Sequence, residues 1–239
     1  MSIILHDLAG ADPALRFSPY CWRTRFALAH KGLAVETRPW RFHETGRLAA
    51  LGAEKVPVIE DGVIEDGGRA VSDSWAIATY LEEAHPDRPS LFGGAGGRAH
   101  ARFLNAWADS VLHVGIAPMV AADIWAALDP RDQPYFRQSR EARLGGTLED
   151  LAAGREALLP AFRHSLTPLR LVLRAQPWLG GAEPSYADYI VAGSLQWPRV
   201  ISHFPLLTED DPLRAWFDRV LDLFAGLGGK ATRVGPGGP

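Results

Sequence analysis

The chain contains a single cysteine, Cys21, among its 239 residues. One cysteine excludes an internal disulfide, a CxxC redox pair and a cysteine-rich zinc site. The chain also lacks an excess of charge, because 25 basic and 28 acidic residues leave a net charge of −3. It therefore has no basic field of the kind on which non-specific nucleic-acid binding depends, and we expect no nucleic-acid partner.

Long hydrophobic runs and metal-ligand clusters are missing as well. The most apolar stretch, residues 111–128, is interrupted by four residues that break an apolar run: His113, Gly115, Pro118 and Asp123. The first residues lack the basic and apolar regions of a signal peptide. The eight histidines form no ligand cluster, and His43 lacks the second histidine of a zinc-binding HExxH motif. We expect a cytoplasmic protein with no membrane segment and no metal.

Residues 1–84 alternate short strands and helices, which predicts a small α/β domain. The predicted order is β-α-β-α-β-β-α, with strands at 3–6, 35–38, 56–60 and 69–72. The helices between them are expected to begin at Pro19 and end at Gly32, to span 45–51 as a helix or turn, and to span 73–84.

The rest of the chain reads as helical. A linker rich in proline and glycine, residues 85–97, separates it from the first domain. Helical character then recurs at 98–114, 118–128, 135–144, 148–176, 186–202 and 212–227. This predicts an all-helical domain at 98–227, followed by a flexible tail at 228–239 that contains several glycines and prolines.

Ser18 is the first candidate for a chemical role, because it precedes Pro19 at the predicted start of a helix. Free backbone N–H groups and the helix dipole favour an anion at such a point, and a thiolate there has a lowered pKa. The alternative is that Ser18 only caps the helix.

Two further signals lie in the same predicted domain. Val56-Pro57 begins a strand, where a cis bond would present the Val56 backbone to an extended peptide ligand and a trans bond would only start the strand. Asp73-Ser74 precedes a helix, where it forms an N-cap. The same pair is suited to an amino-acid end group, with the carboxylate of the ligand on Ser74 and its ammonium on Asp73.

Ser18, Val56-Pro57 and Asp73-Ser74 resemble, in order and spacing, the glutathione-site residues of glutathione transferases. The resemblance implies a thioredoxin-like N-terminal domain, an all-α C-terminal domain, glutathione as co-substrate and a homodimer. Residues 184–188, P-S-Y-A-D, resemble the capping box of that family's helical domain.

Within that family, residues 18–24, S-P-Y-C-W-R-T, resemble bacterial glutathione-dependent β-etherases, which cleave lignin aryl ethers. Residues 144–149, 153–156 and 207–214 also resemble them. The resemblance implies that Ser18 activates the glutathione thiol for attack on an apolar, aromatic electrophile, and that it binds glutathione together with Tyr20. A glutathione-binding carrier of hydrophobic ligands, or a glutathione-dependent isomerase or peroxidase, would share these residues.

Several other side chains have competing interpretations. His43 and Lys55 are candidates for the glycyl carboxylate of glutathione, although each also suits a solvated loop. Phe103, Trp107 and Val111 follow one helical stripe, which suits either a co-substrate pocket or the core of a bundle. Residues 18–21, S-P-Y-C, resemble a glutaredoxin C-P-Y-C motif, in which the first position is the exposed nucleophile. Ser18 occupies that position here, so Cys21 is interpreted as a packing residue.

Overall fold

A computed structural model describes residues 3–62 and 67–235 of the chain. Its N-terminal part contains a four-stranded sheet in the order β2-β1-β3-β4. β1 runs parallel to β2 and antiparallel to β3, and β3 pairs antiparallel with β4. The strands are β1 (Ile3–Leu8), β2 (Val35–Trp40), β3 (Val58–Asp61) and β4 (Arg69–Ser72).

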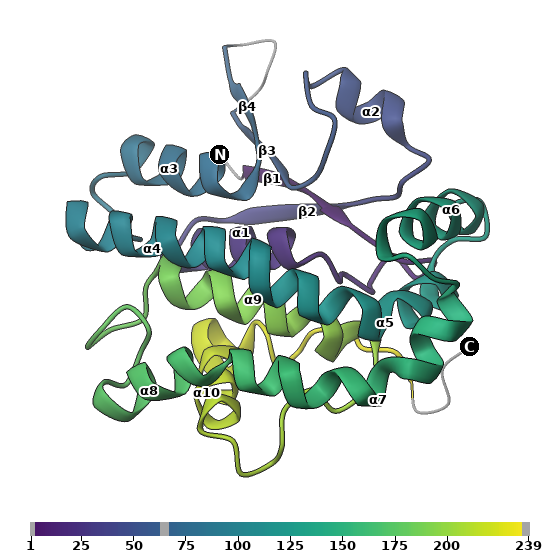
Figure 1. Ribbon diagram of the computed structural model, residues 1–239. Helices are drawn as coiled ribbons and strands as arrows, with labels where there is room; N and C mark the ends of the chain where they lie inside the picture. The colour runs from purple at the N-terminus through teal and green to yellow at the C-terminus, as the bar shows by residue number, and fades with distance from the viewer. Residues whose placement is uncertain (1–2, 63–66, 236–239) are drawn as a thin grey trace.

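Three helices complete this domain: α1 (Pro19–His30), α2 (Thr45–Ala49) and α3 (Ser74–Ala84). α1 and α3 pack against each other, and α2 lies on the opposite side of the sheet (Figure 1). Pro19 occupies the first turn of α1, where its missing N–H costs no hydrogen bond. Gly32 follows the helix with φ +64°, a conformation that glycine adopts without strain. The predicted α/β domain is therefore present, with the expected order of elements.

The remaining described elements are helices, and α9 lies at their centre. The helices are α4 (Ala95–Trp107), the π-helical turn η2 (Ala108–Leu112), α5 (His113–Ala127), α6 (Gln133–Leu144), α7 (Leu148–Ser165), α8 (Thr167–Ala175), α9 (Tyr186–Ile201) and α10 (Pro212–Gly226). Almost every residue of α9 is buried, because it packs against α1 of the first domain and against α4 and α5 of its own. Figure 1 shows α9 between α1 and the outer helices.

The α4–η2–α5 segment corrects two predicted boundaries. Helix begins at Ala95, inside the predicted linker, and continues through Pro118, where the sequence suggested a break. Pro118 has no N–H, so the carbonyl of Val114 lacks its helical donor. Val114 is 66 % exposed, so water reaches that turn. By length and composition this run, Ala95–Ala127, could cross a membrane. In the fold, α4 and α5 both pack against α9, and α5 also packs against α7.

Two more predictions at the C-terminal end are wrong. The helix expected at 148–176 divides at Leu166, because Pro168 removes an N–H and crowds the carbonyl one turn before it. The tail predicted from Gly228 onward is docked as far as residue 235: Gly229 N–H donates to Leu221 O at 3.0 Å and Val234 N–H to Val200 O at 2.9 Å. Residues 236–239 of that prediction lie outside the described chain.

Candidate functional site

Ser18 caps α1 and retains an unused hydroxyl hydrogen. Its Oγ accepts a hydrogen bond from the Cys21 N–H at 3.3 Å, and the residue is 4 % exposed. Within residues 3–62 and 67–235, its own O–H donates no hydrogen bond of ordinary geometry, and the neighbouring Cys21 sulfur is only a weak acceptor. The first turn of α1 contains no acidic side chain to offset the positive end of the helix dipole. The site can therefore stabilise an anion with a hydroxyl and a helix N-terminus together.

The Val56-Pro57 and Asp73-Ser74 segments are joined directly by a hydrogen bond. The Val56-Pro57 bond is cis, and Pro57 O accepts a hydrogen bond from Asp73 N–H at 3.2 Å. β3 begins directly after Pro57 and β4 ends directly before Asp73, with Val58 paired to Ser72 in the sheet. α3 starts at the end of β4 and packs against α1. The pKa of Tyr20, in the first turn of α1, is raised mainly by burial, and Asp73 is close enough to this phenol to contribute to the shift.

Asp73, rather than Ser74, is the N-cap of α3. Its Oδ1 accepts from Trp75 N–H at 2.9 Å and from Ala76 N–H at 3.0 Å, while Oδ2 has no partner among the described residues. The residue has φ +78°, an uncommon conformation for a residue with a Cβ and one that aspartate tolerates better than most. Ser74 is buried, and its carbonyl accepts a hydrogen bond from the Tyr186 hydroxyl at 2.7 Å.

His43 and Lys55 have different surroundings. His43 is tied across the domain boundary, because its N–H and its Nδ1 lie 2.9 and 2.8 Å from Oδ1 of Asp132, a buried residue. Lys55 is exposed, and its carbonyl accepts from the Ser72 hydroxyl at 3.2 Å. A role for either residue in holding a carboxylate stays a prediction.

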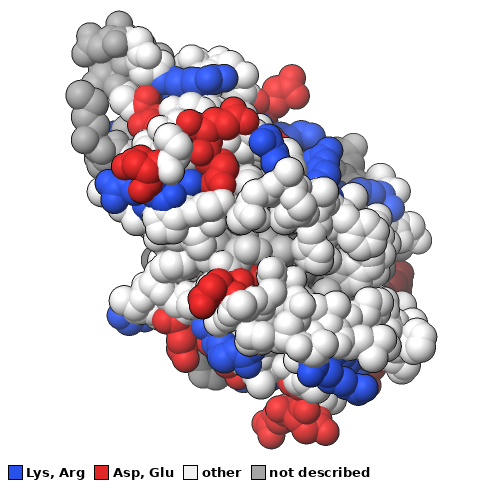
Figure 2. Space-filling view, turned by 90° about the vertical axis from the view of Figure 1, so that its left-hand side faces the viewer, with Lys and Arg blue, Asp and Glu red and all other residues white. Residues whose placement is uncertain are grey.

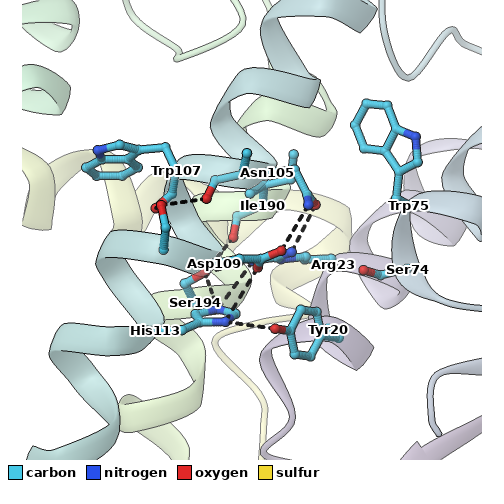
Figure 3. A network of polar contacts seen from close by, with 12 residues as sticks. Tyr20, Arg23, Ser74, Trp75, Asn105, Trp107, Asp109, His113, Ile190 and Ser194 are labelled. Atoms are coloured by element: carbon cyan, nitrogen blue, oxygen red, sulfur yellow. Dashed lines mark hydrogen bonds and ion pairs between the residues drawn. The ribbon is translucent and has the colours of Figure 1, made fainter.

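A buried arginine near Ser18 was missed by the sequence analysis. Arg23 is fully buried between α1 and the helical domain, and its guanidinium donates to Asn105 Oδ1 and Asp109 Oδ1, each at 3.0 Å. Figure 3 shows Arg23 and Tyr20 of α1 facing Asp109 and His113. Asn105, Asp109 and His113 recur every four residues, and this polar stripe on an apolar helix was the signal that could have revealed the network.

Tyr20 and His113 form the outer part of this network. The Tyr20 hydroxyl lies 3.1 Å from His113 Nδ1, and the two rings meet edge to face. Burial, and to a lesser degree the charge of Arg23, lowers the pKa of His113 to about 3, so its ring is neutral. Burial, with a contribution from Asp109, raises the pKa of Tyr20, so the phenol stays protonated near neutral pH.

The predicted co-substrate residues lie on another side of the same helix. Phe103 is 68 % exposed, and the Trp107 ring projects away from Arg23 and Tyr20 (Figure 3). Two residues along a helix correspond to roughly 200°, so the Phe103 stripe lies nearly opposite the Asn105 stripe. A pocket lined by Phe103, Trp107 and Val111 stays a prediction.

Cys21 is a packing residue, as the sequence analysis indicated. Its side chain is fully buried in the core, and burial raises the pKa of its thiol well above the usual value. The thiol is therefore neither accessible nor ionised near neutral pH. Within the part of the chain that the structure describes, no group of three or more histidine, cysteine, aspartate or glutamate side chains is arranged to hold a metal ion.

Both halves of the chain match models of one protein family. The N-terminal domain of glutathione S-transferases matches residues 17–84, and the C-terminal domain of the same enzymes matches residues 99–207. The two matches follow each other in the family's own order. The chain belongs to the glutathione S-transferase superfamily. The first match includes Ser18, Pro57, Asp73 and Ser74.

Solved glutathione transferases share the whole fold. The chain is similar to glutathione transferase GSTFuA3 from Phanerochaete chrysosporium, with a TM-score of 0.80 and 27% identity over 92% of this chain and 96% of that one. It is also similar to glutathione S-transferase CsGST63524 of Ceriporiopsis subvermispora, solved in complex with glutathione, with a TM-score of 0.79 and 27% identity over 94% and 97% of the two chains. The predicted fold class is confirmed.

Curated relatives match over shorter segments. The probable glutathione S-transferase GSTU1 of Oryza sativa subsp. indica is 37% identical over 103 residues, which are 39% of this chain and 42% of that protein. The chain thus spans less than half the length of this relative.

Proposed function

We propose that this protein is a glutathione transferase in which Ser18 activates the thiol of bound glutathione. The observation that carries the proposal is the combination of a family match over residues 17–84 with a Ser18 hydroxyl at the N-terminus of α1. That hydroxyl has a hydrogen to donate, and the helix end favours negative charge.

The energy that this activation needs is within reach of the site. A thiol with a pKa of about 8.5 is only about 3 % ionised at pH 7. Lowering the pKa by about 2 units makes roughly three quarters of it thiolate and requires about 2.7 kcal/mol of preferential anion stabilisation. One hydrogen bond to a charged acceptor contributes about 1.5–3 kcal/mol, and the helix N-terminus about 0.3–1 kcal/mol.

The remaining proposed contacts involve the γ-glutamyl and glycyl ends of glutathione, which lie on either side of its thiol. The γ-glutamyl end would lie at Asp73 and Ser74, where one carboxylate oxygen of Asp73 is free to accept from an ammonium. The Val56 backbone would pair with the peptide, and His43 or Lys55 would hold the glycyl carboxylate. Ser18 acts as a hydrogen-bond donor in this arrangement, so the mechanism needs no general base.

As the electrophile we propose an apolar aromatic compound, and specifically a β-aryl ether next to a ketone. The support is the likeness of residues 18–24 and 207–214 to bacterial β-etherases. The thiolate sulfur attacks the carbon beside the carbonyl, the carbon–oxygen bond breaks, and its electron pair leaves on the aryloxide. Glutathione is then joined to the ketone as a thioether, and orientation supplies much of the rate.

The test is an assay of the purified protein with α-phenoxyacetophenone, with and without glutathione. We expect glutathione-dependent release of phenol together with an equal amount of thioether. Binding of glutathione without any product would identify a carrier instead. A parallel assay with cumene hydroperoxide in place of the ketone covers the peroxidase alternative: oxidation of glutathione to its disulfide with reduction of the hydroperoxide to the alcohol, and no thioether from the ketone, would identify peroxidase-type chemistry.

We also propose a cytoplasmic homodimer. Phe103 is 68 % exposed on the α4–α5 run, and a second copy of the chain packed there would remove this apolar side chain from water. Charged side chains of both signs lie above and below a broad belt of uncharged residues on the face in Figure 2. Light scattering after gel filtration tests this proposal, and a mass of about one chain, 26.1 kDa, would contradict it.

A further inference from the structure

The contacts of His113 determine which of its ring nitrogens carries the hydrogen. Nε2 lies 3.3 Å from Nη2 of Arg23, and a guanidinium nitrogen can only donate. The Ser194 hydroxyl, 3.0 Å from the same Nε2, has an alternative acceptor in Ile190 O at 2.9 Å. Nε2 is therefore the acceptor, and in a neutral ring the hydrogen resides on Nδ1.

This tautomer fixes the role of the Tyr20 hydroxyl. His113 Nδ1–H donates to the Tyr20 oxygen at 3.1 Å. Asp109 Oδ1 is farther from Nδ1, at 3.5 Å, and already accepts from Arg23 at 3.0 Å. Because its oxygen accepts from His113, the Tyr20 O–H hydrogen points elsewhere, and no other partner for it lies among the described residues.

The position of Tyr20 indicates what that hydrogen would meet. Tyr20 lies in the first turn of α1, two residues after Ser18, and it is only partly buried. Its ring contacts His113 of the helical domain and lies under the guanidinium of Arg23, 4.8 Å from the ring centre. With Ser18 and the helix end assigned to the thiolate in the proposed function, the free O–H of Tyr20 is a donor of the same helical turn on the side that contacts the helical domain.

We infer that Tyr20 is a catalytic residue that donates its hydroxyl hydrogen bond to the leaving-group oxygen of the electrophile. The inference rests on the proposed function. As the thiolate forms the carbon–sulfur bond and the carbon–oxygen bond breaks, the departing aryloxide gains the electron pair and Tyr20 stabilises it. Arg23 and His113 are positioning residues, since they hold the Tyr20 oxygen as an acceptor and leave its hydrogen free. One preorganised donor of this kind changes kcat by about a hundredfold.

Two ketones that yield the same thioether separate this role from all others. α-Phenoxyacetophenone loses a phenoxide and α-chloroacetophenone loses a chloride, while the attacked carbon and the product are identical. Tyr20→Phe should lower kcat with the ether by about a hundredfold and leave kcat with the chloride within about threefold. The absorbance of glutathione thiolate bound to the variant should equal that of the wild type. Tyr135→Phe, which removes the hydroxyl of an exposed tyrosine on α6, is the matched control and should change neither rate.

The outcomes distinguish this inference from the proposed function. An equal loss on both ketones, or no loss on the ether, overturns the role of Tyr20 alone. Absence of glutathione-dependent turnover of either ketone by the wild type overturns the proposed function and the inference with it. A measurement on the wild type guards against a variant that fails to fold: kcat over a series of substituted phenoxides should depend less steeply on phenol pKa than the reaction with free glutathione thiolate. Equal slopes would contradict the inference.

Discussion

At the scale of single residues, the sequence predicts the site residues that act through their neighbours in the chain, but not those that act through distant partners. Ser18 and Asp73 are caps, and capping follows from residue type and the residues next in the chain. Arg23 is different, because its partners Asn105 and Asp109 are 82 and 86 residues away. An arginine on a mostly apolar helix has no local pattern that reveals its burial.

Asp73 offers a test in which capping and ligand binding separate. Asp73→Asn keeps an oxygen to accept from Trp75 and Ala76 and tolerates φ +78°, but it removes the negative charge proposed to hold the ammonium of glutathione. We expect glutathione affinity to fall by about 1.5–3 kcal/mol in calorimetry, with a nearly unchanged melting temperature. Unchanged affinity in the folded variant would show that Asp73 is a cap and nothing more.

At the scale of elements, the sequence predicts the helices better than their ends. Every helix described in the second domain overlaps a predicted helical region, because apolar periodicity records which face is buried. The fusion of α4, η2 and α5 across Pro118 was not predictable, since it depends on how the run packs against α7 and α9. The break at Leu166 was within reach of the sequence, because Pro168 follows it.

The N-terminus of α9 is held by a capping box with a buried carboxylate. The Asp188 carboxylate is fully buried and accepts four hydrogen bonds, from Leu179 N–H, Gly180 N–H, Ser185 N–H and the Trp216 indole. Asp188→Ala leaves these donors buried without acceptors, so we expect the free energy of unfolding to fall by about 3–5 kcal/mol in urea titrations. Asp218→Ala, at an exposed carboxylate on α10, should cost less than about 0.5 kcal/mol. Equal effects of the two substitutions would refute a structural role for the capping box.

At the scale of the whole molecule, the two domains are joined by polar contacts as well as by a shared core. Tyr186 O–H reaches Ser74 O, His43 reaches Asp132, and Arg23 reaches Asp109 across the boundary. None of these pairs could be read from the sequence, since each needs the docking of the domains. The site at the N-terminus of α1 therefore depends on both domains being folded.

His113 makes this interface sensitive to acid. In the folded protein its pKa is lowered to about 3, whereas in the unfolded chain it is about 6.5. Between these values the unfolded state binds one more proton, so stability falls as pH falls, by up to about 1.4 kcal/mol per pH unit. From pH 7.5 to 5.0 this site alone should remove about 2 kcal/mol of the free energy of unfolding.

Urea titrations at the two pH values measure this contribution. His113→Gln cannot take up the proton, so its loss of stability between pH 7.5 and 5.0 should be smaller than that of the wild type by about 2 kcal/mol. His100→Gln, which replaces an exposed histidine on α4, should lose as much stability as the wild type. Identical pH dependence of the His113→Gln variant and the wild type would contradict a neutral, buried His113.

The measurement that bears most directly on the account is a titration of the thiolate absorbance of bound glutathione. In the wild type the pKa of the bound thiol should lie about 2 units below its free value, and in Ser18→Ala it should return most of the way. Turnover near neutral pH should fall by roughly ten- to over a hundredfold, far more than glutathione affinity, and should recover in part at higher pH. Cys21→Ala, the control for the buried thiol of the same helix, should titrate like the wild type. If the Ser18→Ala and wild-type curves superimpose, Ser18 is only a helix cap and the proposed activation of glutathione is wrong.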